Sequence, residues 1–162
     1  MKNTNWNDKD VVLKAVYEDG LSLKYASKEL RNDKDVVLKA VYEDGLSLQY
    51  ASKELKNNKE VVMVAVEKKG WALEYASNEL KNNKEIVMVA VDQNGYSLKY
   101  ASNELQKDMD ILKVYFNYEN HDLEDEFYKD RLNYYNIMIE QEYMIANAHI
   151  NSIKTKSKVV KF

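Results

Sequence analysis

The hydrophobic and polar positions of this chain recur with a period of 25 residues. Residues 7–30 read NDKDVVLKAVYEDGLSLKYASKEL, and residues 32–55 repeat them with one change, Gln49 in place of Lys24. Residues 57–80 and 82–105 form a second, more diverged pair, NNKEVVMVAVEKKGWALEYASNEL and NNKEIVMVAVDQNGYSLKYASNEL. A fixed period of this length indicates a repeat protein whose units stack on one another.

The first half of each unit predicts a helix. Val12, Ala15 and Val16 form an apolar stripe at spacings i, i+3 and i+4. Asn7 stands three residues before an acidic residue, which is an Asn version of the capping box. Asp8 is the competing N-cap, and the sequence leaves the choice open.

The chain has four glycines, and each occupies the same position in its unit: Gly20, Gly45, Gly70 and Gly95. We interpret them as structural turns that end the first helix in a left-handed C-cap with positive φ. A second helix is expected from about Ser22 to Arg31, with Leu23, Ala26 and Leu30 buried.

These patterns predict an all-α fold, a short α-solenoid of four 25-residue helix–turn–helix repeats with a C-terminal capping helical segment. Neither helix of a unit is stable alone, so stacking is needed to bury the apolar stripes. The expected organisation is a lead-in (1–6), four repeats (7–31, 32–56, 57–81 and 82–106), a helical cap (107–150) and a basic tail (151–162).

The segment after the repeats begins like a fifth first helix at residues 108–114 and then departs from the pattern, with a break at residues 120–122. A single helix is expected from Leu123 to about Ile150. It either caps the last repeat or, through its broad apolar surface, pairs with another copy. The lysine-rich tail, residues 151–162, is expected to be a disordered end.

The units resemble the family of repeats known as domain of unknown function 4116. The family's pattern begins Asn-Asp-Lys-Glu-Val-Val, which this chain matches as NDKDVV, NNKEVV and NNKEIV. The single glycine and the Tyr-Ala-Ser segment recur in the same register, and the resemblance covers Asn7 to Leu105. It implies helical repeats and offers no catalytic residues to carry over.

Composition and charge narrow the function classes. The net charge is −3, from 24 basic and 27 acidic residues, which argues against a general nucleic-acid binder. The chain has no cysteine, which suits a reducing compartment, so we expect a soluble intracellular protein. The longest apolar runs, Val61–Val66 and Ile86–Val91, are far too short to insert into a membrane.

The residues that usually carry chemistry are sparse. The glycines are too far apart for a phosphate-binding loop, and the two histidines, His121 and His149, have no partner at metal-ligand spacing. Acidic residues beside His121 favour a helix N-terminus over a cation site. We expect no cofactor, no metal and no enzymatic activity.

The positions that differ between near-identical units suggest a binding surface. The residue after glycine is Leu21, Leu46, Trp71 or Tyr96, which is either the apolar contact of a helix C-cap or a row of anchors for a partner. Tyr17 and Tyr42 are further candidates. The sequence thus favours a non-catalytic protein–protein interaction module with an unidentified protein partner. The alternative is a self-assembling homo-oligomer, and nucleic-acid binding through the tail is the weakest option.

Overall fold

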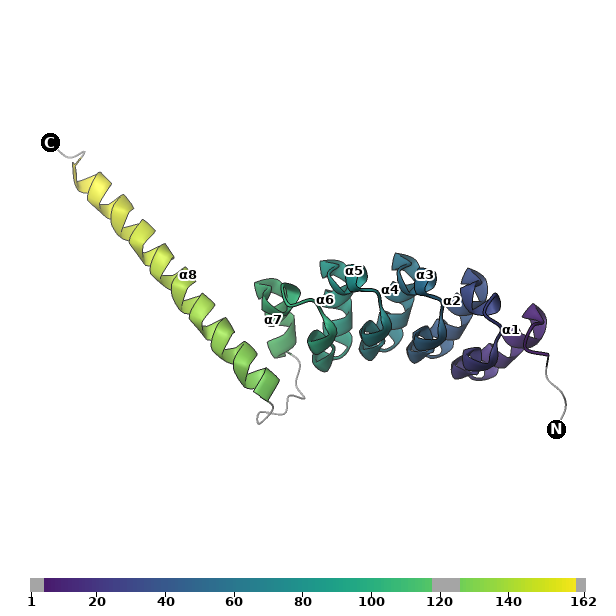
Figure 1. Cartoon of the computed structure of the whole chain (residues 1–162). Coiled ribbons are helices and arrows are strands. Elements are labelled where there is room, and N and C mark those ends of the chain that lie inside the picture. Colours follow the sequence, from purple (N-terminus) through teal and green to yellow (C-terminus); the bar gives the residue numbers. More distant parts are fainter. Residues whose placement is uncertain (1–4, 118–125, 160–162) are drawn as a thin grey trace. The chain divides into compact units, whose positions relative to one another are not determined.

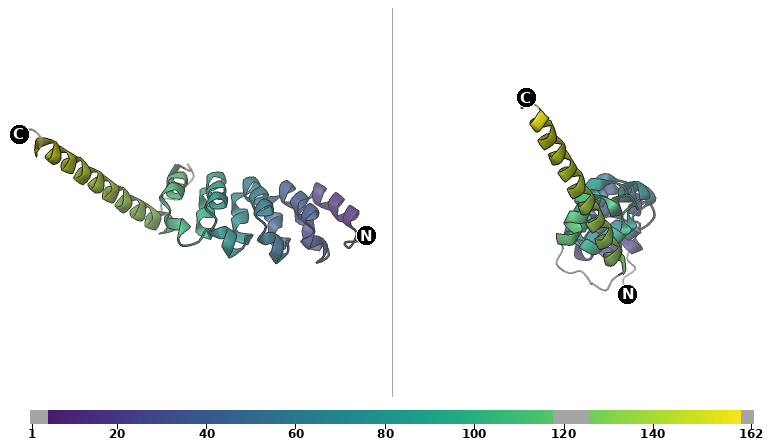
Figure 2. Two further views of the ribbon diagram at one scale, coloured as in Figure 1. Left: turned by 90° about the horizontal axis from the view of Figure 1, so that it is seen from above. Right: turned by 90° about the vertical axis from the view of Figure 1, so that its left-hand side faces the viewer.

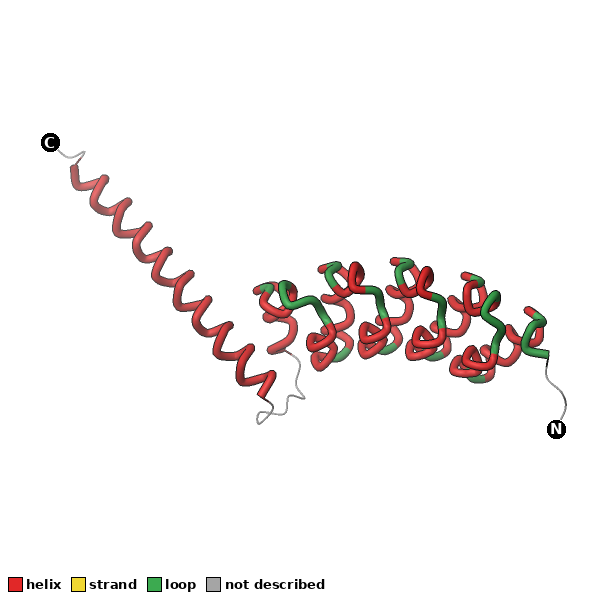
Figure 3. Tube along the Cα trace, viewed as in Figure 1, coloured by secondary structure: helices red, strands yellow, loops and turns green. Residues whose placement is uncertain are grey.

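A computed structural model of the chain describes residues 5–117 and 126–159, with side chains described as far as residue 150. The chain divides into two compact units, Met1–His121 and Asp122–Phe162. Throughout the described ranges the regular elements are helices, as Figure 3 shows. The all-α repeat fold predicted from the sequence is therefore confirmed. Residues 107–150, grouped above as one cap, are divided between the two units.

The first of these two compact units is a series of similar helical modules that follow one another along the chain (Figure 1). Each module corresponds to one of the 25-residue repeats. Its α-helices are α1 (Lys9–Glu18), α2 (Lys34–Glu43), α3 (Lys53–Lys56), α4 (Lys59–Lys68), α5 (Asn78–Lys81), α6 (Lys84–Gln93) and α7 (Met109–Asn117). Its 3₁₀ helices are η1 (Gly20–Tyr25), η2 (Leu30–Asn32), η3 (Gly45–Tyr50), η4 (Gly70–Tyr75), η5 (Gly95–Tyr100) and η6 (Leu105–Lys107).

The long helix of each module begins at the second of the two candidate caps. The side chain of Asp8 accepts hydrogen bonds from the N–H groups of Asp10 and Val11, and Asp33 does the same in the next module. Asn58 and Asn83 cap α4 and α6 by accepting one hydrogen bond each, from the N–H groups of Val61 and Ile86. The structure therefore selects the second position over the capping box.

The apolar stripes are buried by stacking, as the repeat pattern predicts. In α2, Val36, Val37, Ala40 and Val41 are fully buried. The long helices pack in the order α1, α2, α4, α6, α7, and η1, η3, η4 and η5 pack in a second, parallel row. The left-hand view of Figure 2 shows this succession from above. Each module thus covers the face that its neighbour leaves open.

The prediction of one continuous second helix is wrong. Each module has a 3₁₀ helix that starts at glycine and ends at tyrosine, and the following alanine is extended, with φ −64° and ψ 158° at Ala51. The helix is interrupted here because the N–H of Ser52 donates to the carbonyl of Arg31 in the preceding module, at 2.9 Å. The Ser52 hydroxyl then accepts from the Leu55 N–H and caps α3. This serine therefore caps the short helix that follows it.

The left-handed conformation predicted for Gly20, Gly45, Gly70 and Gly95 is also wrong. In the described residues no glycine has a positive φ. These glycines are needed for a different reason, close backbone approach. A Cβ atom on Gly20 would lie 2.5 Å from the carbonyl oxygen of Ala40, and Gly45 and Gly70 approach the next module more closely still. The glycine therefore marks where consecutive modules touch.

The end of the chain extends the repeat and then leaves it. Helix α7 buries Ile111, Leu112 and Tyr115 as a fifth long helix, and it packs on α6. Helix α8 (Glu126–Val159) forms the long helix of the second unit. The expected break at residues 120–122 lies outside the described residues. Residues 151–159, expected to be disordered, continue α8 because no glycine or proline ends it. Among the described helices, none has a stretch apolar and long enough to cross a membrane.

Candidate partner-binding surfaces

The residues that follow the glycines differ in how far they reach the solvent. Leu21, Leu46 and Tyr96 are half-buried, whereas Trp71 is 42% exposed. Each is the second residue of a 3₁₀ helix. The side chain of the residue before the glycine accepts a hydrogen bond from the N–H of Leu21, Leu46 and Tyr96. Lys69 makes no such bond before Trp71. Trp71 is thus the predicted anchor with the most accessible ring.

The Trp71 ring is held by the next module. It meets the Tyr100 ring edge-on at a centroid distance of 6.5 Å. The Lys99 ammonium lies 5.1 Å from the Trp71 ring and 5.0 Å from the Tyr100 ring. These contacts order a large side chain that remains accessible, which is the condition for an interface anchor.

Tyr17 and Tyr42 are exposed on the long helices, at 64% and 56%. The Lys39 ammonium lies 4.3 Å from the Tyr17 ring and 5.7 Å from the Tyr42 ring, and Lys68 lies 4.2 Å from Tyr42. Lysine and tyrosine therefore alternate from one module to the next. These two tyrosines make their contacts with lysines of the long helices, whereas Trp71 contacts the row of 3₁₀ helices.

A row of lysines at the start of the long helices is neutralised across the module boundaries. Lys9 pairs with Asp33 at 2.8 Å, and Lys34 and Lys59 pair with Glu60 and Glu85 at 2.5 Å. Although partial burial opposes it, hydrogen bonds from Lys9 and from backbone N–H groups hold the pKa of Asp33 below its ordinary value. The row is therefore a set of salt bridges that joins consecutive modules.

A second surface was not singled out from the sequence. Where two modules meet, the Tyr-Ala-Ser segment of one module and the end of the preceding module enclose a pocket. The three pockets have volumes of about 590, 290 and 410 Å³ and centre on Tyr50, Tyr75 and Tyr100. Lys53 lines the first and second, and Asn78 lines the second and third. We call this continuous surface the tyrosine groove.

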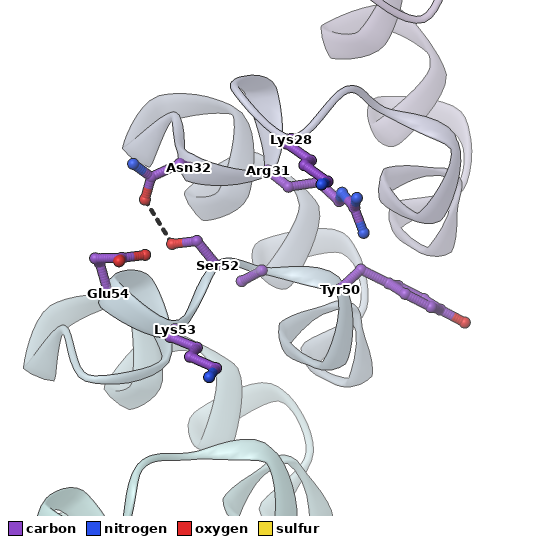
Figure 4. A pocket seen from close by; sticks show the side chains of 8 residues that line it. Lys28, Arg31, Asn32, Tyr50, Ser52, Lys53 and Glu54 are labelled. Carbon is purple, nitrogen blue, oxygen red and sulfur yellow. Dashed lines mark hydrogen bonds between the residues drawn. The ribbon is translucent and has the colours of Figure 1, made fainter.

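Each pocket of the tyrosine groove carries a cation from the preceding module: Arg31, Lys56 or Lys81. Figure 4 shows Arg31 and Lys28 on the same side of the first pocket as the Tyr50 ring, while Glu54 projects from the opposite side. In the first module Trp6 takes the place of the cation and packs on Tyr25, with ring centroids 5.0 Å apart. The sequence feature that could have indicated the tyrosine groove is the tyrosine that every repeat carries at the same position.

The comparisons with known proteins agree with the repeat architecture. The model of a family described as domain of unknown function (DUF4116) matches residues 8–56, 35–81 and 58–106, which together span more than half of the chain. The chain belongs to this family. Each DUF4116 match covers about two modules, so the family unit corresponds to a stacked pair. Neither a curated protein nor a solved structure matches the chain significantly.

In the part of the chain that the structure describes, no three His, Asp or Glu side chains come together in a way that could hold a metal ion. His149 is exposed on α8, and His121 with its acidic neighbours lies outside the described residues. The expectation that the protein is not an enzyme stays a prediction.

Proposed function

We propose that the protein is a non-catalytic protein–protein interaction module, an adaptor or effector-like solenoid that acts inside a cell. One observation carries the proposal. The apolar side chains that stay the same from unit to unit are mostly buried, such as Val62, Val66 and Leu73, whereas the side chains that change are mostly exposed, such as Trp71 and Glu67. A few exposed polar residues are also the same in every unit, and Lys59 is one that joins neighbouring modules by a salt bridge. The duplicated units therefore share a scaffold and differ in the surface that they present.

The exposed aromatic side chains support this proposal. Trp71 and Tyr42 keep large rings in solvent while neighbouring lysines restrict them. Tryptophan and tyrosine dominate the energetics of many interfaces, because they bury a large area at a small cost in side-chain entropy. A rigid array of such anchors suits recognition of another protein.

The proposal is tested by comparing Trp71→Ala with Val62→Ala. The full chain captures partners from a lysate of its source cell, and a purified partner is then titrated by calorimetry. Trp71→Ala should weaken binding by about 1–2 kcal/mol while the melting temperature changes little. Val62→Ala should instead lower the melting temperature by opening a cavity, and binding should persist below it.

Two results would contradict the proposal. The first is that no purified partner binds the full chain directly, and the second is that Trp71→Ala destabilises the fold as much as Val62→Ala. The second result would make Trp71 a packing residue despite its exposure.

The alternative is a self-assembling protein that oligomerises through α8. It is favoured by the apolar side chains that α8 exposes, among them Tyr143, Met144 and Ile145, each about 70% accessible. Light scattering of the full chain over a range of concentrations decides it. A constant monomer mass excludes self-assembly, and a dimer that is lost in Ile145→Glu supports it.

A further inference from the structure

We propose that the tyrosine groove binds an extended acidic peptide segment whose carboxylate side chains enter successive pockets. This inference rests on the proposed function and names the chemistry of the partner. It follows from the charges of the groove, from the spacing of its pockets and from the contrast with the neutralised lysine row.

In the ranges that the structure describes, these three cations of the groove have no carboxylate partner. Arg31, Lys56 and Lys81 form no ion pair in the described residues, in contrast to the paired lysines at the start of the long helices. The Arg31 Nε is buried and has no hydrogen-bond partner there. A guanidinium presents five donors in a planar fork that fits a carboxylate, so the first pocket has donor capacity for an incoming acid.

The acidic side chain nearest the first pocket does not neutralise it. The Glu54 backbone N–H, and after it the neighbouring Ser52 side chain, lower the pKa of the Glu54 carboxyl, so this carboxylate is engaged with its own helix turn. Burial, together with the positive charge of Arg31, lowers the pKa of Lys56. Its ammonium donates only to the Gln49 carbonyl, at 2.7 Å, among the described residues. An external carboxylate would relieve this concentration of positive charge.

The spacing of the pockets suits an extended chain. Neighbouring helices pack roughly 8–10 Å apart. A peptide extended in the polyproline II conformation advances about 3.1 Å per residue and returns every third side chain to the same face. One module therefore corresponds to about three residues of ligand. A peptide with an acidic side chain at every third position would place one carboxylate beside Arg31, Lys56 and Lys81 in turn, with its backbone across the tyrosine rings.

Charge density favours a peptide over nucleic acid. Single-stranded nucleic acid also combines stacking on aromatic rings with neutralised phosphates. However, the chain carries a net charge of −3, and Glu54 lines the same groove. A ligand with isolated charges, three residues apart, avoids these carboxylates better than a continuous row of phosphates.

The test is a titration of the full chain with a fluorescent seven-residue peptide that has aspartate at positions one, four and seven. Controls are the asparagine version, a version with the three aspartates adjacent, and a single-stranded oligonucleotide. We expect saturable binding of the first peptide, weaker binding of the adjacent version and none of the asparagine version.

Matched variants locate the site. Lys56→Gln should weaken binding about tenfold, since it removes one charged hydrogen bond. Lys59→Gln makes the same change in net charge but removes a lysine already paired with Glu85, so affinity should stay within about twofold. Lys81→Gln provides a second groove variant if Lys56→Gln folds poorly, which circular dichroism reports.

Equal losses in Lys56→Gln and Lys59→Gln would overturn the assignment to the groove. Absence of peptide binding, or binding of the oligonucleotide alone, would overturn the acidic peptide as ligand. Neither result bears on the Trp71 comparison, because that experiment measures a cellular partner whatever its charge.

Discussion

The residue type at a given position of this repeat is restricted by contacts with the neighbouring module as much as by contacts within its own module. A backbone carbonyl of the next module lies where the side chain of Gly20, Gly45 or Gly70 would begin. The constraint is distance and not φ, since these glycines have ordinary backbone conformations. Near these glycines only small side chains fit: Ser47 and Ala72 occupy equivalent buried positions in consecutive modules.

Replacement of Gly45 separates the two explanations. Asparagine tolerates positive φ, so Gly45→Asn would be mild if a left-handed turn were required. Because its Cβ would meet the Ala65 carbonyl, we expect Gly45→Asn and Gly45→Ala each to lower the free energy of unfolding by more than about 1 kcal/mol. Urea denaturation measures this, with Ser47→Ala as a near-neutral control. A mild Gly45→Asn beside a harmful Gly45→Ala would restore the left-handed turn.

At the scale of the element, hydrogen bonds between modules decide where helices stop. The N–H groups of Ser52, Ser77 and Ser102 each donate to a carbonyl of the preceding module, and that of Ser27 donates to the carbonyl of Trp6 in the lead-in. A single α-helix would use those N–H groups internally. Because the module gains a contact with its neighbour and a capped short turn, the segment divides into a 3₁₀ helix and a second, shorter turn.

Proline at Lys53 tests the division of the second helix. Lys53 is the first residue of α3, and Ser52 before it is extended, with φ −61° and ψ 164°. Both features suit proline, so Lys53→Pro should change the free energy of unfolding by less than about 1 kcal/mol. In a continuous helix the same change would cost about 3 kcal/mol. Lys39→Pro, inside α2, is the matched control and should be strongly destabilising in thermal denaturation.

Some of the secondary-structure elements could be predicted from the sequence alone, and others could not. The long helices, their apolar stripes and the fifth helix at Ile111 and Leu112 were predicted, because periodicity and capping are local signals. The 3₁₀ segments, the role of glycine and the tyrosine groove were not, because they depend on contacts between residues about one repeat apart. Of the predicted anchors, Trp71 is exposed as a partner site requires, whereas Leu21 and Leu46 are half-buried.

At the scale of the whole molecule, the solenoid needs an end that covers its last apolar face. In α6, Ile86, Val87, Ala90 and Val91 are fully buried, and α7 packs on this helix. The chain carries this fifth long helix without a following 3₁₀ helix in the described residues. Tyr115 stands where the other units have alanine and is 1% exposed, so a large ring helps to fill the end of the stack.

Two truncations test whether α7 is sufficient as the cap. A chain that ends at His121 keeps α7 and removes the second unit, and we expect it to melt cooperatively within a few degrees of the full chain. A chain that ends at Lys107 also loses α7 and uncovers Val87 and Val91. Each large apolar side chain returned to water costs about 1.5–3 kcal/mol, so the melting temperature should fall by more than about 10 °C or the protein should aggregate. Calorimetry and light scattering of both chains provide the measurement. If the chain ending at His121 aggregates as readily as the shorter one, the second unit has a share in protecting the stack, and the longer cap predicted from residues 107–150 would be the better description.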